Sequence, residues 1–280
     1  MAGTSVEASD GVALYAEAHG TGLPVLFSCP LNTTCENWRP QVDPLVAQGF
    51  RVVLWDFRGH GRSDAPDDPA AYSMEQVVDD LGRVLDWAAP AAPAAPAVLG
   101  GLSFGGLASL HFALRAPARV RGLLLIDSGP GFKNPEAQQR WEAGVEKTAS
   151  FLERKGMQAF VESRAAATTF GGRPELPAAQ AARRAIAAQQ PHGLAHFGRR
   201  VAALAPPVID ELASIRIPAL VIVGEHDAAY QRAAQVMQAR LPLAESVTIP
   251  GAGHIVNIEA AEAFNAVVLR FLERLRAGEA

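Results

Sequence analysis

The chain has 280 residues, of which 49% are hydrophobic, so it is long enough to bury a substantial core and too apolar to be disordered. Its 25 basic and 29 acidic side chains give a formal net charge of −4, and no run of basic residues marks a nucleic-acid surface. No apolar stretch reaches the roughly 18 residues of a membrane span, and residues 1–10 lack the basic and apolar segments of a signal peptide. These features predict a soluble, cytoplasmic protein.

The first half of the chain alternates segments of strand character with segments of helix character. Asp10-Gly11 separates two β-compatible segments, which predicts a hairpin within residues 6–18. Ser73 is a predicted helix cap because Gln76 follows it by three residues. The predicted strands are residues 24–28, 51–56, 97–100 and 122–127, and the predicted helices are residues 40–48, 73–88 and 107–115. This alternation is typical of a mainly parallel, doubly wound α/β sheet, with the Ala/Pro-rich residues 89–96 as a surface loop.

The pattern changes after residue 128. From residue 129 to residue 213 no segment has convincing strand character, and the sequence is rich in Ala, Arg and Gln. Helical stretches are predicted at residues 135–155, 157–169, 178–190 and 193–204. Strand character returns at residues 219–224 and 246–249, and residues 260–276 form a closing amphipathic helix. The strand-poor segment therefore indicates a helical insertion.

A glycine-flanked serine lies between a predicted strand and a predicted helix. Gly101-Leu102-Ser103-Phe104-Gly105 follows the apolar run 97–100 and precedes the helix 107–115. In a tight strand–turn–helix connection of this kind, the central serine is held in a strained backbone conformation with its hydroxyl exposed. A side chain at either glycine would collide with the neighbouring strand or helix. Ser103 is therefore the candidate nucleophile.

An acid and a histidine follow the serine, each in a loop after a predicted strand. Asp227 lies in Gly224-Glu225-His226-Asp227, and His254 ends Pro250-Gly251-Ala252-Gly253-His254. A serine hydroxyl needs a base to accept its proton, and histidine titrates near neutrality. A carboxylate on the other imidazole nitrogen fixes the tautomer and stabilises the imidazolium. We favour Asp227 as the acid over Asp127 and Asp56, which also follow predicted strands.

The order Ser103, Asp227, His254 resembles that of the α/β-hydrolase family, and the resemblance extends over nearly the whole chain. It implies an α/β-hydrolase fold: a mostly parallel eight-stranded sheet flanked by helices, with a helical cap inserted after the sixth strand. Residues 1–128 and 214–280 would form the core domain and residues 129–213 the cap.

In that family two backbone N–H groups stabilise the developing oxyanion. One would come from Phe104, directly after the serine. The other would come from the loop after the third strand, where many relatives carry His-Gly and this chain has Cys29-Pro30. Pro30 has no N–H, so we assign the second donor to Leu31.

The same loop narrows the resemblance within the family. Ser28-x-x-Leu31-x-Thr33-Thr34, followed by Trp38, resembles the Ser-Asn-Ser-Leu-Gly-Thr loop of 3-oxoadipate enol-lactonases, although Asn32 stands where that loop has glycine. The resemblance implies a lactonase- or carboxylesterase-like branch. Ser103, Asp227 and His254 would cleave a small ester or lactone through an acyl-enzyme, without a cofactor.

Other functions stay open on the sequence alone, because a fold does not determine the reaction. The same three side chains serve C–C bond hydrolysis, perhydrolysis and acyl transfer in relatives, and some members of the family are receptors or binding proteins. A small-molecule partner is expected, with no nucleic acid and no membrane.

Several conspicuous residues are assigned other roles. The Arg58–Asp64 loop, with His60, is interpreted as structural. His192 and His196 have helical spacing but lack a third ligand, so no metal site is predicted. Phe132 and Trp141 line either the pocket or the core of the cap. Cys29 and Cys35 are expected to be buried, reduced thiols.

Overall fold

The structure is a computed structural model that describes residues 3–89 and 95–279. Residues 90–94 of the predicted surface loop lie outside this description. None of the described helices combines the length and the apolar character needed to cross a membrane.

The described chain alternates strands and helices in the order that the sequence predicts. The strands are β1 (Thr4–Glu7), β2 (Ala13–His19), β3 (Leu23–Ser28), β4 (Phe50–Trp55), β5 (Ala97–Leu102), β6 (Val120–Ile126), β7 (Ala219–Gly224) and β8 (Ala244–Ile249). The α-helices are α1 (Arg39–Ala47), α2 (Met74–Ala88), α3 (Phe104–Arg115), α4 (Pro135–Val161), α5 (Ala167–Phe170), α6 (Pro177–Ala187), α7 (Pro191–Phe197), α8 (Ala228–Arg240), α9 (Val256–Glu259) and α10 (Ala261–Ala277). Ser73 caps α2 as predicted, because its side chain accepts the Gln76 N–H. Helix α8 is an addition to the predicted elements.

The strands form one eight-stranded sheet in the order β1-β2-β4-β3-β5-β6-β7-β8. β2 pairs antiparallel with β1 and β4, and all other pairs are parallel. This confirms the predicted mostly parallel α/β sheet and the hairpin at Asp10-Gly11. Because parallel strands end at one edge, the loops after β3, β5, β6, β7 and β8 gather there.

Two apolar cores lie on the two faces of the sheet. Helices α2, α3 and α8 pack on one face through residues such as Leu81, Leu110 and Met237. Helices α1 and α10 cover the other face, where Leu45 and Phe271 are buried. The near-continuous apolar strands β3 to β7 are what a parallel sheet buried on both faces requires.

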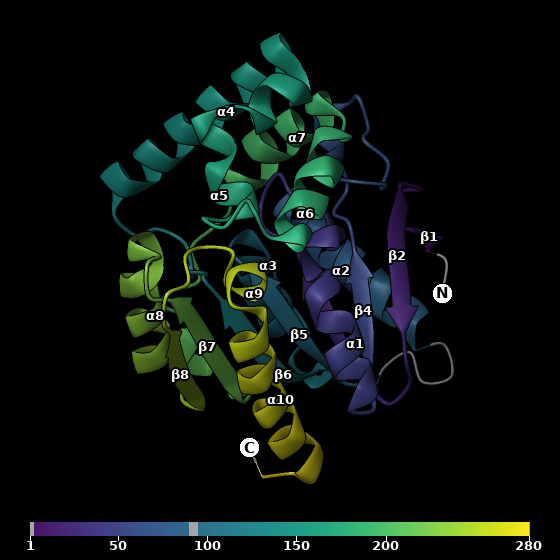
Figure 1. The fold of residues 1–280 in the computed structure, drawn as a ribbon, viewed down its shortest axis with the longest axis vertical. Coiled ribbons are helices and arrows are strands. Elements are labelled where there is room, and N and C mark those ends of the chain that lie inside the picture. Colours follow the sequence, from purple (N-terminus) through teal and green to yellow (C-terminus); the bar gives the residue numbers. More distant parts are fainter. Residues whose placement is uncertain (1–2, 90–94, 280) are drawn as a thin grey trace.

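Helices α4 to α7 follow the sixth strand, as predicted, and gather at the end of the molecule where the parallel strands terminate (Figure 1). They have an apolar cluster of their own, which includes Leu152, Phe160 and Ile186. Gly156 has φ 75° and ψ 178°, which interrupts α4 where the sequence predicts the boundary between two helices.

Candidate active site

Ser103 is the single residue between β5 and α3, and its backbone is strained. Its φ and ψ angles are 55° and −117°, a region that non-glycine residues rarely adopt. A Cβ at Gly101 would lie 2.1 Å from the Gly105 carbonyl carbon, and one at Gly105 would lie 2.3 Å from the Ser28 carbonyl oxygen. Glycine is therefore required on both sides, as the sequence predicts.

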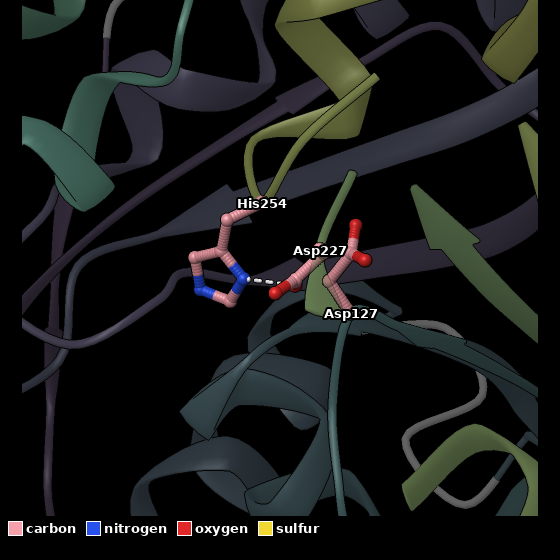
Figure 2. Close-up of side chains that lie close together, drawn as sticks. All are labelled: Asp127, Asp227 and His254. Atoms are coloured by element: carbon pink, nitrogen blue, oxygen red, sulfur yellow. Dashed lines mark hydrogen bonds and ion pairs between the residues drawn. The ribbon is translucent and has the colours of Figure 1, made fainter. Parts of the chain in front are cut away.

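His254 and Asp227 meet across two neighbouring loops. The Nδ1 atom of His254 lies 2.6 Å from Oδ2 of Asp227, and Asp227 is buried (Figure 2). The loops are held together because the His226 N–H donates to the Ala252 carbonyl at 2.8 Å. Among the described residues, Nε2 of His254 has no hydrogen-bond partner, and Figure 2 shows it on the side of the ring away from Asp227.

Ser103, Asp227 and His254 line one cavity of about 350 Å³. Tyr230, which no sequence motif marks, contacts both the serine and the histidine. Its hydroxyl is 3.2 Å from Ser103 Oγ, and its ring stacks on His254 with centroids 5.0 Å apart. Burial raises the pKa of Tyr230, so the phenol stays neutral and can donate a hydrogen bond.

The two alternative acids lie in different surroundings. Asp127 directly follows β6 and accepts the Gly224 N–H through Oδ1, while Oδ2 has no partner among the described residues. Burial, together with the Asp227 carboxylate, raises the pKa of Asp127 far above its ordinary value. Asp56 instead accepts the backbone N–H groups of Cys35 and Arg62, outside the site. His254 is therefore bonded to the acid that the sequence analysis favours.

The two predicted oxyanion donors are available. In residues 3–89 and 95–279, neither the Leu31 N–H nor the Phe104 N–H donates to a protein acceptor. Leu31 lines the cavity beside the serine.

The loop that carries Leu31 is held by its neighbour Asn32, whose φ of 64° lies in the left-handed region that favours glycine. The Asn32 N–H donates to Nε2 of His60 at 3.2 Å, and its carbonyl accepts from Gln189 Nε2 at 2.9 Å. Burial lowers the pKa of His60 to about 4, so the ring stays neutral and Nε2 can accept. His60 is structural, as predicted, and it acts by supporting this loop.

Asp127, Asp227 and His254 form the one described group whose ligand atoms are close enough to share a metal ion, within 4.8 Å of one another. A metal ligand must be deprotonated. The raised pKa of Asp127 opposes this, and His254 Nδ1 is already bonded to Asp227. The group therefore fits acid–base chemistry better than metal binding.

The free cysteines and the histidine pair of α7 have other environments. Cys29 and Cys35 are buried, which raises the pKa of each thiol and disfavours a thiolate nucleophile. Nε2 of His192 lies 2.9 Å from the Ala65 carbonyl, and its ring centroid lies 6.3 Å from that of His196.

This geometry agrees with comparisons to known proteins. A family model described as the alpha/beta hydrolase fold matches residues 24–261. The chain belongs to this family. The resemblance inferred from the sequence is thereby confirmed, together with the assignment to hydrolases.

The relatives of this α/β hydrolase are named for several different hydrolytic activities. It is 32% identical over 279 residues to a Rhizobium rhizogenes protein provisionally named carbamate hydrolase RutD, covering 92% of this chain and 97% of the relative. A thermophilic esterase from Thermogutta terrifontis has a TM-score of 0.82 and 27% identity, covering 98% of this chain and 99% of the esterase. The enol-lactonase from Burkholderia xenovorans has a TM-score of 0.79 and 27% identity, covering 96% of this chain and all of the lactonase (100%).

Proposed function

We propose that this α/β hydrolase cleaves a small ester or lactone through an acyl-enzyme, with Ser103, His254 and Asp227 as nucleophile, base and acid. The contact of 2.6 Å between His254 and Asp227 is the observation that carries the proposal. It directs the unbonded Nε2 atom of a histidine toward the cavity that Ser103 also lines. The esterase and enol-lactonase relatives support the substrate class.

Tyr230 donates to Ser103 Oγ in this mechanism, which leaves the serine proton free for Nε2 of His254. Oγ attacks the carbonyl carbon, and the Leu31 and Phe104 N–H groups stabilise the oxyanion. The intermediate collapses as the bond to the leaving oxygen breaks, and His254 gives that oxygen its proton. His254 then takes a proton from water as the water oxygen attacks the acyl carbon. The second intermediate collapses as the bond between the acyl carbon and Ser103 Oγ breaks, and His254 returns the proton to Oγ, which releases the acid and restores the serine. Asp227 stabilises the imidazolium in both halves of the reaction.

We further propose that residues 129–213 act as the cap. Their helices supply Trp141, Val145 and Leu152 to the wall of the cavity that Ser103 also lines. Water is thereby restricted at the serine, which strengthens the oxyanion hydrogen bonds.

The test is hydrolysis of p-nitrophenyl acetate by Ser103→Ala and by Ser109→Ala. Ser109 is a matched serine on the helix that follows Ser103, α3, where its hydroxyl donates to the Gly105 carbonyl. Ser103→Ala is expected to lose at least about 10³-fold in kcat/KM, because the triad acts as a unit. Ser109→Ala retains activity. In addition, diethyl p-nitrophenyl phosphate should add one diethylphosphoryl group to the unmodified chain and none to Ser103→Ala, as measured by intact-protein mass spectrometry. Near-normal hydrolysis by Ser103→Ala would remove the serine mechanism.

A further inference from the structure

Two cavities meet at the candidate nucleophile. The first, of about 350 Å³, contains Ser103 and His254, and we name it the histidine chamber. The second, of about 320 Å³, also reaches Ser103 but not His254. Both are of a size that holds a small organic group. Trp141, Ala229 and Tyr230 line both cavities and therefore form the partition between them.

The second cavity, which we name the apolar chamber, is lined almost entirely by hydrocarbon groups. Its side chains come from the core and from the inserted helices, and they include Phe104, Leu107, Phe132, Trp141, Ala205 and Ala233. The polar nitrogens on its wall are already bonded: Gln138 Nε2 donates to Ala203 O and Glu142 Oε1, and Trp141 Nε1 donates to Ala202 O. An apolar group therefore enters this chamber without leaving those N–H groups unpaired.

The histidine chamber has apolar side chains such as Val145 and Leu152, but it also carries polar groups that the apolar chamber lacks. Asn32 lines it, and the Asn32 carboxamide has no hydrogen-bond partner among the described residues, although Asn32 is buried. Because this carboxamide lines the cavity and is not engaged by the protein, it can form hydrogen bonds with a polar ligand. Thr148 and Arg140 add further polar groups to this wall.

The position of the base decides which part of a substrate enters which chamber. After attack by Ser103 Oγ, the tetrahedral carbon carries the leaving oxygen and the acyl carbon in different directions. The leaving oxygen must reach His254, which protonates it as the carbon–oxygen bond breaks. The leaving group therefore lies in the histidine chamber, and the acyl chain is directed into the chamber that lacks His254.

We propose that the substrate is an ester of an apolar aliphatic acid with a small polar alcohol, its acyl chain bound in the apolar chamber and its alcohol in the histidine chamber. Phe132, with 43% of its surface exposed, adds an apolar side chain between this chamber and solvent. This assignment rests on the proposed function, because it takes Ser103 and His254 as the reacting pair.

A pair of isomeric esters tests the orientation. Ethyl octanoate and octyl acetate have the same composition and carry the eight-carbon chain on opposite sides of the ester. We expect kcat/KM for ethyl octanoate to exceed that for octyl acetate by at least about tenfold, since even one buried methylene discriminates by that factor. Equal rates, or a preference for octyl acetate, would overturn the assignment.

Variants of the apolar chamber locate the acyl site. Ala233→Phe should lower the ratio of kcat/KM for p-nitrophenyl octanoate to that for p-nitrophenyl acetate by about tenfold or more, because the new ring occupies the chamber. Ala239→Phe, an exposed position on the same helix, should leave the ratio unchanged. Leu107→Ala enlarges the chamber, so the acyl chain length that gives the highest kcat/KM should increase. This second variant tests the assignment even if Ala233→Phe does not fold.

These outcomes separate the two proposals. If Ala233→Phe and Leu107→Ala hydrolyse p-nitrophenyl acetate but keep the original chain-length profile, the acyl assignment is wrong and the serine mechanism stands. If the unmodified chain hydrolyses none of these esters and forms no phosphoryl adduct, the proposed function itself is wrong.

Discussion

Two aspartates lie in the loops after the neighbouring strands β6 and β7, close to His254, and they have different environments. Asp227 bonds to Nδ1 of His254, whereas Asp127 is buried with one bond to a backbone N–H. A carboxylate oxygen of Asp127 lies within 4.8 Å of one of Asp227, and two carboxylates this close do not both ionise readily in a buried site. Since burial and Asp227 raise the pKa of Asp127, that side chain carries the proton at neutral pH.

Asp127→Asn and Asp227→Asn should therefore have very different effects, although each replaces a carboxylate by an amide. An amide at position 127 imitates the protonated acid and can still accept the Gly224 N–H, so kcat/KM at neutral pH should change little. An amide at position 227 stabilises the wrong histidine tautomer and should lower kcat by roughly 10³- to 10⁴-fold. Ester hydrolysis near pH 7 measures both, and a loss at 127 equal to that at 227 would make Asp127 the working acid.

The difference in stability between Asp127→Asn and the unmodified chain should also depend on pH in a defined direction. Above the ordinary pKa of an aspartate, the unfolded chain has released a proton that folded Asp127 keeps, so the free energy of unfolding falls as pH rises toward the raised pKa. The amide removes this dependence. Urea unfolding at about pH 5 and about pH 8 should show the variant gaining stability over the unmodified chain. A constant difference would mean that Asp127 is already ionised.

The sequence places these residues at strand ends but does not reveal which contacts they make. A loop position after a strand predicts that Asp56, Asp127 and Asp227 all lie at one edge of the sheet. Which of them reaches His254 depends on strand order and on side-chain direction, and neither is a local property. Tyr230 and Asn32 were missed as site residues because no spacing rule marks them, although the replacement of a glycine by Asn32 was visible. The catalytic roles themselves stay predictions until the variants are measured.

At the scale of elements, Glu259 joins the histidine loop to the inserted helices. Its carboxylate accepts the N–H groups of Gly253 and Ile255, on either side of His254, at 2.9 and 3.2 Å. It also accepts the Gly172 N–H, between α5 and α6, at 3.1 Å. One side chain at the end of α9 thus fixes the loop that presents the proposed base.

Glu259→Gln should loosen this loop, because an amide nitrogen cannot accept a hydrogen bond from a backbone N–H. We expect the free energy of unfolding to fall by about 1–3 kcal/mol, the usual cost of losing a hydrogen bond to a charged group. Glu259 does not line either substrate cavity. We therefore expect the substitution to lower kcat by a larger factor than the factor by which it raises KM.

Glu262→Gln is the matched control for this prediction. Glu262 is exposed on the first turn of α10 and has no hydrogen bond or ion pair among the described residues. Urea unfolding and p-nitrophenyl acetate kinetics on both variants check the comparison. Equal behaviour of the two would show that Glu259 does not position the loop.

The sequence predicts the strands of the sheet better than the inserted helices, because the two kinds of element bury their residues in different patterns. The parallel strands are continuous apolar runs, and their predicted ends agree with the structure within two residues. The inserted helices bury only one side, and their Ala-rich sequence gives weak periodicity. The predicted helix at residues 157–169 is divided into the end of α4, a 3₁₀ turn at Arg164–Ala166 and the short helix α5. Part of the predicted stretch 193–204 is a π-helical turn, Gly198–Ala202. Helix α8 was not predicted, and its stripe of buried residues is short.

At the scale of the whole molecule, a buried arginine ties three separate parts of the chain together. Arg58, in the loop after β4, donates from Nε and Nη2 to the two carboxylate oxygens of Asp80 on α2, each at 2.7 Å. The same guanidinium bonds to Asp10 in the turn between β1 and β2 and to the Ala71 carbonyl. Both Arg58 and Asp80 are 1% exposed, so the pair is shielded from solvent.

Asp80→Asn should destabilise the whole fold, because it leaves a buried guanidinium without its main counter-charge. Breaking a buried pair by changing one partner costs about 3–5 kcal/mol. Glu153→Gln provides the contrast, since Glu153 bonds to Arg199 on the surface, where such a pair contributes about 1 kcal/mol or less. Urea unfolding monitored by circular dichroism measures both, and the slope with denaturant shows whether unfolding stays two-state. A cost for Asp80→Asn as small as that for Glu153→Gln would mean that Asp10 and the Ala71 carbonyl alone hold Arg58, and that the hairpin, α2 and the loop after β4 are anchored independently.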